Sequence, residues 1–154
     1  MSSTTPCLWF DHDGLAAAQL YVSLFPGSAI TSTSPGGPDG APLTVSFDLD
    51  GRPYTIINGG PLYPQSEAFS IQVACADQAE VDRYWDGLVA DGGTEGQCGW
   101  LKDPWGVSWQ IVPNRLYELL GDPDRARAGR ATNAMMGMKR LVVAELEAAA
   151  DAPA

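Results

Sequence analysis

One hydroxyl and one amide lie on the same side of the segment 107–112, and they are the clearest chemical signal in the chain. Ser108 and Gln110 alternate with bulky apolar residues, which are Val107, Trp109 and Ile111. Because successive side chains of a strand point to opposite faces, this alternation predicts a strand with one apolar and one polar face. A helix can cover the apolar face. The polar face, which also carries Val112, suits the wall of a ligand cavity.

Groups that perform nucleophilic or metal chemistry are few. The three cysteines, Cys7, Cys75 and Cys98, lie far apart and form no C-x-x-C pair, so they indicate neither a disulfide framework nor a zinc site. We interpret them as buried thiols, with Cys98, beside Gly99, as the one candidate nucleophile. The single histidine, His12, argues against a catalytic triad or a multi-histidine metal site within one chain.

Length and charge limit the classes of protein. The 154 residues, 45% of them hydrophobic, predict a single domain over 1–154. A net charge of -10 disfavours binding to nucleic acid or to an anionic membrane, although an acidic surface could attract a cationic ligand. We find no pattern of a signal peptide and no apolar run of the roughly 18 residues that a membrane helix needs. We therefore expect a cytoplasmic protein.

The first half of the chain is predicted to form a βαβββ module over residues 6–60. Strand patterns cover 7–10, 28–34, 43–49 and 53–57, and a helical pattern covers 15–25. Asp13 is a candidate cap for this helix. Asp50-Gly51 predicts a hairpin turn.

The same order recurs over residues 67–113, which indicates an internal duplication. A strand at 68–75 precedes a helix at 78–90 that Asp77 can cap, and a hairpin follows over 97–113. Asp103-Pro104-Trp105-Gly106 predicts the turn of this hairpin, and Pro113 ends its last strand. The tail, 114–150, is predicted to be helical over 115–120, 122–138 and 141–150, with its methionines packed against the body or a second subunit.

Two such modules in about 110 residues resemble the plan of the vicinal oxygen chelate superfamily, which includes glyoxalase I, extradiol dioxygenases and bleomycin-resistance proteins. The stretches that look most like its PhnB-like branch, often labelled demethylubiquinone methyltransferase, are 6–11, 21–26, 58–61, 76–82 and 96–113. The resemblance implies an α+β fold in which two βαβββ modules form a curved mixed sheet around a cavity, with helices outside and C-terminal helices added. It also implies a homodimer.

In metal-dependent relatives, His, Gln or Glu side chains on the first and last strands of each module bind the ion. The matching positions here fall near Thr5, Thr55, Ser70 and Gln110. Hydroxyls rarely hold a divalent ion without stronger ligands, so we expect neither a metal nor another cofactor. The run Asp11-His12-Asp13 is better explained as a turn than as a replacement site.

The methyltransferase label has little support in the residues. A glycine-rich turn between a strand and a helix usually holds the cofactor of such enzymes, and no G-x-G-x-x-G occurs here. Gly92-Gly93-Thr94-Glu95-Gly96 leads into the predicted hairpin rather than into a helix.

These observations favour a metal-independent small-molecule-binding protein. Aromatic faces and neutral polar groups would contact the ligand, and the predicted ligand-binding residues are Trp9, Thr55, Asn58, Ser70, Gln72, Trp100, Ser108 and Gln110. Trp105 is a further candidate for the cavity wall.

Two alternatives stay open. One is a non-redox enzyme, an isomerase, lyase or transferase that acts on a small carbonyl or aromatic substrate. In that case Gln110 and Asn58 would stabilise developing charge, and Asp11 would be the best available base, with Asp103 more plausibly a turn former. The other is a structural role in which the cavity is collapsed and the helical tail mediates assembly.

Overall fold

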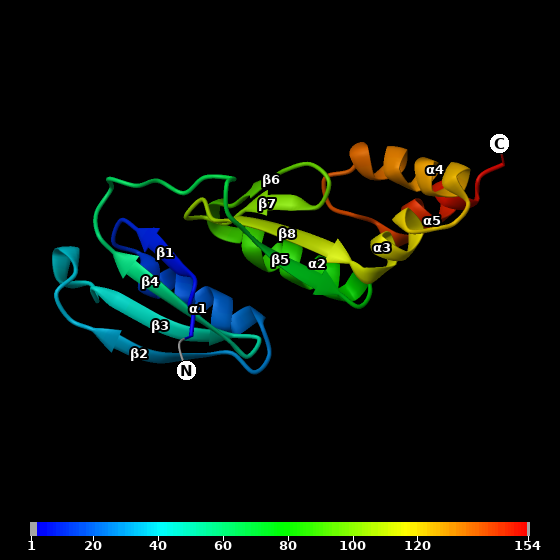
Figure 1. The fold of residues 1–154 in the computed structure, drawn as a ribbon. Helices are drawn as coiled ribbons and strands as arrows, with labels where there is room; N and C mark the ends of the chain where they lie inside the picture. Colours follow the sequence, from blue (N-terminus) through cyan, green and yellow to red (C-terminus); the bar gives the residue numbers. More distant parts are fainter. Residues whose placement is uncertain (1–2, 154) are drawn as a thin grey trace. The chain divides into compact units, whose positions relative to one another are not determined.

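The computed structural model describes residues 3–153, which form two compact units that divide between Gln65 and Ser66 (Figure 1). The first unit contains β1 (Cys7–Phe10), α1 (Gly14–Leu24), β2 (Ala29–Ser34), the 3-10 turn η1 (Pro38–Gly40), β3 (Thr44–Leu49) and β4 (Arg52–Asn58). The second contains β5 (Ser70–Cys75), α2 (Gln78–Val89), the 3-10 turn η2 (Ala90–Gly92), β6 (Thr94–Glu95), β7 (Trp100–Lys102), β8 (Ser108–Pro113), α3 (Asn114–Leu120), α4 (Arg125–Met136) and α5 (Val143–Asp151).

Each unit holds a four-stranded mixed sheet with the same topology. The strand orders are β1-β4-β3-β2 and β5-β8-β7-β6. In both sheets the first strand of the module pairs in parallel with the last, and the other pairs are antiparallel. This repeat confirms the α+β class and the two βαβββ modules. The single-domain assignment stays a prediction.

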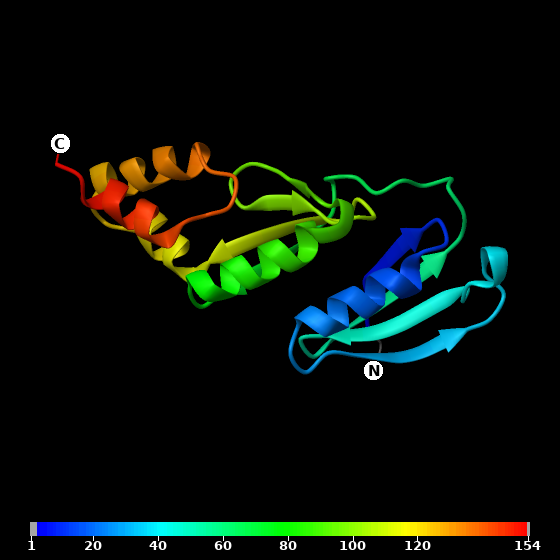
Figure 2. The ribbon, with the colours of Figure 1, turned by 180° about the vertical axis from the view of Figure 1, so that it is seen from behind.

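In the first unit, α1 covers one face of the sheet (Figure 2). The sheet residues buried on that side alternate along their strands, and they include Leu8, Phe10, Val45, Phe47 and Ile56. The turn between β3 and β4 forms as predicted, because Asp50 and Gly51 both have positive φ, at 50° and 73°. Because side chains alternate along a strand, Trp9 and Thr55 lie on the other face of the sheet, which α1 does not cover.

The start of α1 differs from the prediction. Asp13 precedes the helix, but its side chain makes no capping bond because its backbone, at φ -93° and ψ 13°, is not extended. Instead, Asn58 of β4 accepts a hydrogen bond from the Gly14 N–H at 2.9 Å. Only glycine fits there, since a Cβ on Gly14 would lie 2.2 Å from the side chain of Ile56.

In the second unit, α2 packs on β5, β7 and β8, as Figure 2 shows for the helix along that sheet. The predicted cap is confirmed: Asp77 is extended and its carboxylate accepts from the Glu80 N–H at 3.0 Å. Glu80 in turn accepts from the Ala76 N–H at 2.8 Å, which completes a reciprocal pair close to a capping box. Trp85 of the helix and Trp109 of β8 are fully buried on this side.

The turn between β7 and β8 is built around a buried carboxylate. Asp103 is 2% exposed, and its Oδ1 accepts from the backbone N–H groups of Trp105 and Val107, both at 3.0 Å. Its Oδ2 accepts from the indole N–H of Trp109, also at 3.0 Å. A fourth bond, from the Gly106 N–H to the Asp103 carbonyl at 2.9 Å, closes the predicted β-turn. Asp103 is therefore a turn former.

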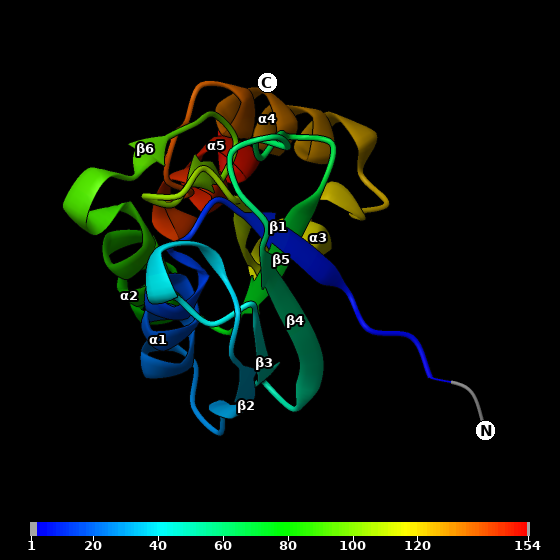
Figure 3. The same ribbon diagram turned by 90° about the vertical axis from the view of Figure 1, so that its left-hand side faces the viewer.

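The tail forms three helices, as predicted, and they cluster beside the second sheet (Figures 1 and 3). Their core holds Val112 with the buried residues Leu116, Leu119, Ala131, Leu141, Leu146 and Ala150. The expectation that Val112 faces a ligand cavity is therefore wrong. Met135 and Met138 pack on this core, whereas Met136 is 62% exposed.

None of the helices within residues 3–153 has the length and apolar character needed to cross a bilayer.

Candidate functional site

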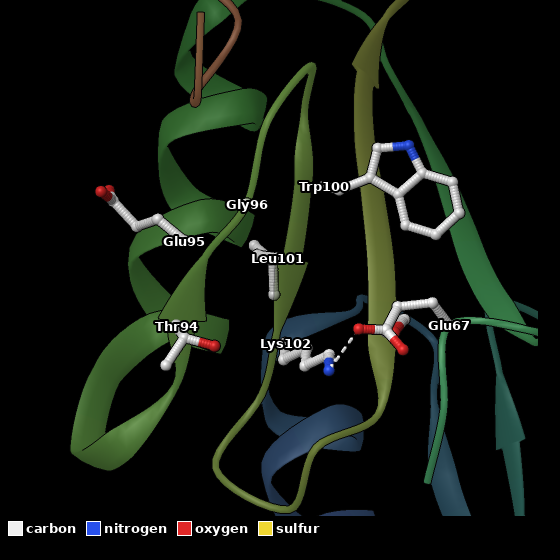
Figure 4. Close-up of a pocket in the computed structure, with 8 residues that line it drawn as sticks. Glu67, Thr94, Glu95, Gly96, Trp100, Leu101 and Lys102 are labelled. Atoms are coloured by element: carbon white, nitrogen blue, oxygen red, sulfur yellow. Dashed lines mark ion pairs between the residues drawn. The ribbon is translucent and has the colours of Figure 1, made fainter.

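A pocket of about 220 Å³ lies in the second unit, on the sheet face that α2 leaves uncovered. It is lined by Glu67, Thr94, Glu95, Gly96, Trp100, Leu101, Lys102 and Ser108 (Figure 4). Trp100, Lys102 and Ser108 come from two paired strands, because Lys102 of β7 faces Ser108 of β8 across the ladder. Two of the predicted ligand-binding residues, Trp100 and Ser108, are thus in the pocket wall.

Ser108 is the most unusual group in this wall. The residue is 1% exposed, and its hydroxyl has no hydrogen-bond partner among residues 3–153. A buried hydroxyl without a partner costs about 1 to 3 kcal/mol, so most proteins avoid one. A group on a ligand in the pocket could provide the bond.

One ion pair borders the pocket. The Lys102 ammonium lies 2.5 Å from the Glu67 carboxylate, as Figure 4 shows. The hydrogen bond from Lys102 lowers the pKa of Glu67, so the pair persists to a lower pH than a free carboxylate would allow. The charge of Lys102 is thereby matched within the wall.

The other carboxylate of the wall is directed elsewhere. Glu95 accepts from the indole N–H of Trp85 at 3.0 Å and lies 3.5 Å from the Lys139 ammonium. These two partners lower the pKa of Glu95, with the Trp85 hydrogen bond contributing most. Its side chain points away from Trp100 and Lys102 (Figure 4). Glu95 is therefore engaged away from the pocket.

Three more of the predicted residues continue the same sheet face beyond the pocket. Ser70 pairs in register with Ser108, and Gln72 pairs with Gln110. Gln110 donates from Nε2 to the Ser70 hydroxyl at 2.9 Å, while its Oε1 lies 3.4 Å from Gln72 Nε2. Gln72 Nε2 also donates to the Tyr117 hydroxyl at 2.7 Å. We call Ser70, Gln72, Gln110 and Tyr117 the polar row.

The remaining predicted residues lie in the first unit. Thr55 is half-buried on the uncovered face of that sheet, in register with Cys7 and Ser46. Trp9 is held by a hydrogen bond from its indole N–H to the Gly60 carbonyl at 2.8 Å. Its ring meets Tyr63 edge-on, with the centroids 5.0 Å apart. The chain that follows β4 thus fixes the ring in place.

Asn58 lies on the opposite face of that sheet, under α1, and is fully buried. Besides capping α1, its amide donates to the Pro42 carbonyl at 2.8 Å. Both ends of the side chain are therefore bonded inside the first unit, which gives Asn58 a structural role.

The positions expected to bind a metal in relatives do not fit one here. Ser70 and Gln110 are bonded to each other, with the amide nitrogen directed at the hydroxyl. Thr5 and Thr55 add only hydroxyls, and divalent metals prefer carboxylate, imidazole or thiolate ligands. Within residues 3–153 no three acidic, histidine or cysteine side chains gather in a metal-binding arrangement. His12 instead lies 3.4 Å from Asp11 and 3.3 Å from Asp13 in an exposed turn.

The cysteines differ from the prediction of three buried thiols. Only Cys75 is buried, and burial raises its pKa to about 12, which makes it unreactive at neutral pH. Cys7 is exposed at the start of β1. Cys98 is half-exposed in the turn before β7, where its sulfur lies 3.8 Å from that of Met136, and it does not line the pocket.

Some site residues were absent from the prediction. Lys102 lies two residues after Trp100 on β7, so the period-two pattern of a strand could have placed it on the same face as Trp100. Glu67 comes from an irregular segment and Tyr117 from the tail, and no local pattern points to either.

Trp105, a further candidate for the cavity wall, is half-buried in the turn between β7 and β8 and does not line the pocket.

Comparison with solved structures supports the fold. A putative 3-demethylubiquinone-9 3-methyltransferase, PhnB protein, from Bacillus cereus is 28% identical with a TM-score of 0.67, over 73% of this chain and 99% of that chain. A protein from Pseudomonas aeruginosa is 19% identical with a TM-score of 0.60, over 73% and 98%. The fosfomycin resistance protein FosX of Listeria monocytogenes, solved with Mn(II) and sulfate, is 16% identical with a TM-score of 0.54, over 77% and 94%.

A comparison with curated proteins gives no match. The sequence model described as 3-demethylubiquinone-9 3-methyltransferase, in contrast, matches residues 2–112, which is most of the chain. Because this match and the shared fold agree, the chain belongs to the PhnB-like, 3-demethylubiquinone-9 3-methyltransferase family, within the glyoxalase/bleomycin-resistance fold of the vicinal oxygen chelate superfamily.

Proposed function

We propose that this protein binds a small, neutral organic molecule, without a metal, in the pocket of the second unit. The observation that carries the proposal is the Ser108 hydroxyl, which is buried in the pocket wall and has no partner in the described part of the chain. A ligand that bonds to this hydroxyl would remove the cost of leaving it unpaired.

The walls of the pocket favour a neutral ligand with a ring. Trp100 offers an aromatic face of the kind that contributes much of the binding energy in small-molecule sites. Lys102 is already paired with Glu67. A charged ligand would therefore have to break that ion pair, or lose its own hydration without gaining an opposite charge in the pocket. Although the acidic surface could attract a cation, a neutral ring avoids both costs.

Metal independence is supported by the donor chemistry of the polar row. FosX shares the fold and was solved with Mn(II). In this chain, the two positions of the second unit where the superfamily resemblance places metal ligands are a serine and a glutamine bonded to each other. The hydrogen bond between Ser70 and Gln110 fixes these two side chains relative to each other, as a bound ion would otherwise do.

Replacing Ser108 with alanine tests the proposal. We expect the free energy of unfolding to stay unchanged or rise by about 0 to 1 kcal/mol, because the variant removes an unpaired buried hydroxyl. The affinity for 4-isopropylphenol, a neutral ring with one hydroxyl, should fall about tenfold because a hydrogen bond is lost. Urea denaturation and NMR titration in EDTA measure the two quantities.

Ser32→Ala is the matched control, since Ser32 is an exposed strand hydroxyl of the first unit. It should change neither quantity. Ser108→Ala binding 4-isopropylphenol as tightly as the wild type would refute a role for this hydroxyl in the ligand site.

The enzyme alternative gains no specific support from the candidate base. Asp11 is exposed beside His12 in the first unit, and Asp103 is fully engaged in its turn. The homodimer and the cytoplasmic location remain predictions from the sequence and the family.

A further inference from the structure

The tail lies beyond the part of the chain that defines the family. The family match ends at residue 112, at the end of β8, so α3, α4 and α5 all follow it. The Bacillus cereus and Pseudomonas aeruginosa proteins are covered over 99% and 98% of their length by 73% of this chain. The helical tail is therefore an addition to the common fold of these relatives.

This addition is fixed to the second sheet rather than loosely attached. The carbonyls of Met138 and Lys139 accept from the N–H groups of Cys98 and Gly99, at 2.7 and 2.8 Å. Gln78 of α2 donates to the Leu141 carbonyl at 3.1 Å and accepts from the Val143 N–H at 2.8 Å. Helix α3 follows β8 directly. The tail is therefore attached to the second sheet at its start, through β8, and again at residues 138–143, through these hydrogen bonds.

Tyr117 is the residue that this addition brings to the polar row. The residue is 48% exposed, and its phenol oxygen accepts the hydrogen bond from Gln72. The side-chain amide of Gln72 thus donates both of its Nε2 hydrogens, one to Tyr117 and one to Gln110. Since the phenol oxygen accepts from Gln72, the Tyr117 hydroxyl keeps its own hydrogen for donation to another acceptor.

The geometry of the sheet sets the length of a ligand that could use both ends of this face. Ser108 and Gln72 lie on neighbouring strands and are offset by two residues. Their Cα atoms are therefore about 8 Å apart, since two residues span about 6.8 Å along a strand and strands lie about 4.8 Å apart. Because Tyr117 is bonded to the side chain of Gln72, this span gives the scale of a ligand that reaches from Ser108 to Tyr117, and a single substituted ring has this length.

We propose that Tyr117 is a recognition residue, and that it selects a neutral ring compound with an oxygen acceptor at the end opposite the group that meets Ser108. This inference rests on the proposed function and deepens it. The phenol O–H of Tyr117 donates to that acceptor, while the hydrogen bond from Gln72 holds the phenol in place. The tail thereby adds specificity to a face that the family already has.

Two neutral probes that differ at one end test the proposal. The carbonyl of 4-acetamidophenol can accept a hydrogen bond, whereas 4-isopropylphenol has a hydrocarbon group in its place. We expect the wild type to bind 4-acetamidophenol about tenfold more tightly in NMR titrations. Tyr117→Phe should abolish this preference and leave the affinity for 4-isopropylphenol unchanged.

Tyr63→Phe is the matched control, since Tyr63 is an exposed tyrosine of the first unit, and it should keep the preference. The side-chain amide signals of Gln72 give a second readout, because they should shift in ligand-free Tyr117→Phe and stay in place in the control. Equal binding of both probes by the wild type would overturn the role of Tyr117 alone. Binding of neither probe would overturn the proposed function as well.

Discussion

Replacing Asp103 with alanine is expected to lower the free energy of unfolding by about 3 kcal/mol. The carboxylate is buried and accepts from two backbone N–H groups and from the indole of Trp109. Its removal takes away the acceptor of three N–H donors, and the turn that sets the register of β7 against β8 loses the group around which it is built. Urea denaturation followed by tryptophan fluorescence measures the loss.

Asp11→Ala is the control for this variant, because Asp11 is an exposed aspartate whose contact with His12 is at the surface. It should change the free energy of unfolding by no more than about 0.5 kcal/mol. A loss below about 1 kcal/mol for Asp103→Ala would show that the turn does not depend on its carboxylate.

Asn58→Ala should lower the free energy of unfolding by about 2 to 4 kcal/mol. The side chain is fully buried, and the substitution leaves the Gly14 N–H and the Pro42 carbonyl unpaired. Both the start of α1 and the segment before β3 depend on these bonds. Chemical denaturation of the purified variant measures the effect.

Asn133 provides the comparison, since it is exposed within α4. Asn133→Ala should stabilise slightly, by about 0.5 kcal/mol, because alanine has the higher helix propensity. If Asn58→Ala were as stable as the wild type, the structural role of Asn58 would be refuted and a ligand contact would again be open.

The elements predicted correctly are those that neighbouring residues determine. The alternation around Ser108 and Gln110 placed β8 and its two faces, and the turn at Asp103 follows from the residue types in it. Local patterns of this kind depend only on the period of the backbone and on turn chemistry. They carry no information about which distant segment completes a site.

Two aspartates at equivalent positions show where such prediction ends. Asp13 and Asp77 both precede a helix, yet of the two only Asp77 caps one, because the backbone of Asp13 is not extended; Asn58 takes the corresponding role in the first unit. In the same way, Gln72 was expected at the site from its strand, but its partner Tyr117 comes from 45 residues further along the chain. Long-range partners of this kind require the folded structure.

The most direct test of ligand binding without a metal is a titration of EDTA-treated, ¹⁵N-labelled protein with 4-isopropylphenol, followed by ¹H–¹⁵N NMR and repeated with Mn²⁺ in place of EDTA. The account predicts chemical-shift changes centred on Trp100, Lys102 and Ser108, with the same affinity in both conditions. Binding that appears only with Mn²⁺, or shifts confined to residues outside this face of the second sheet, would contradict it.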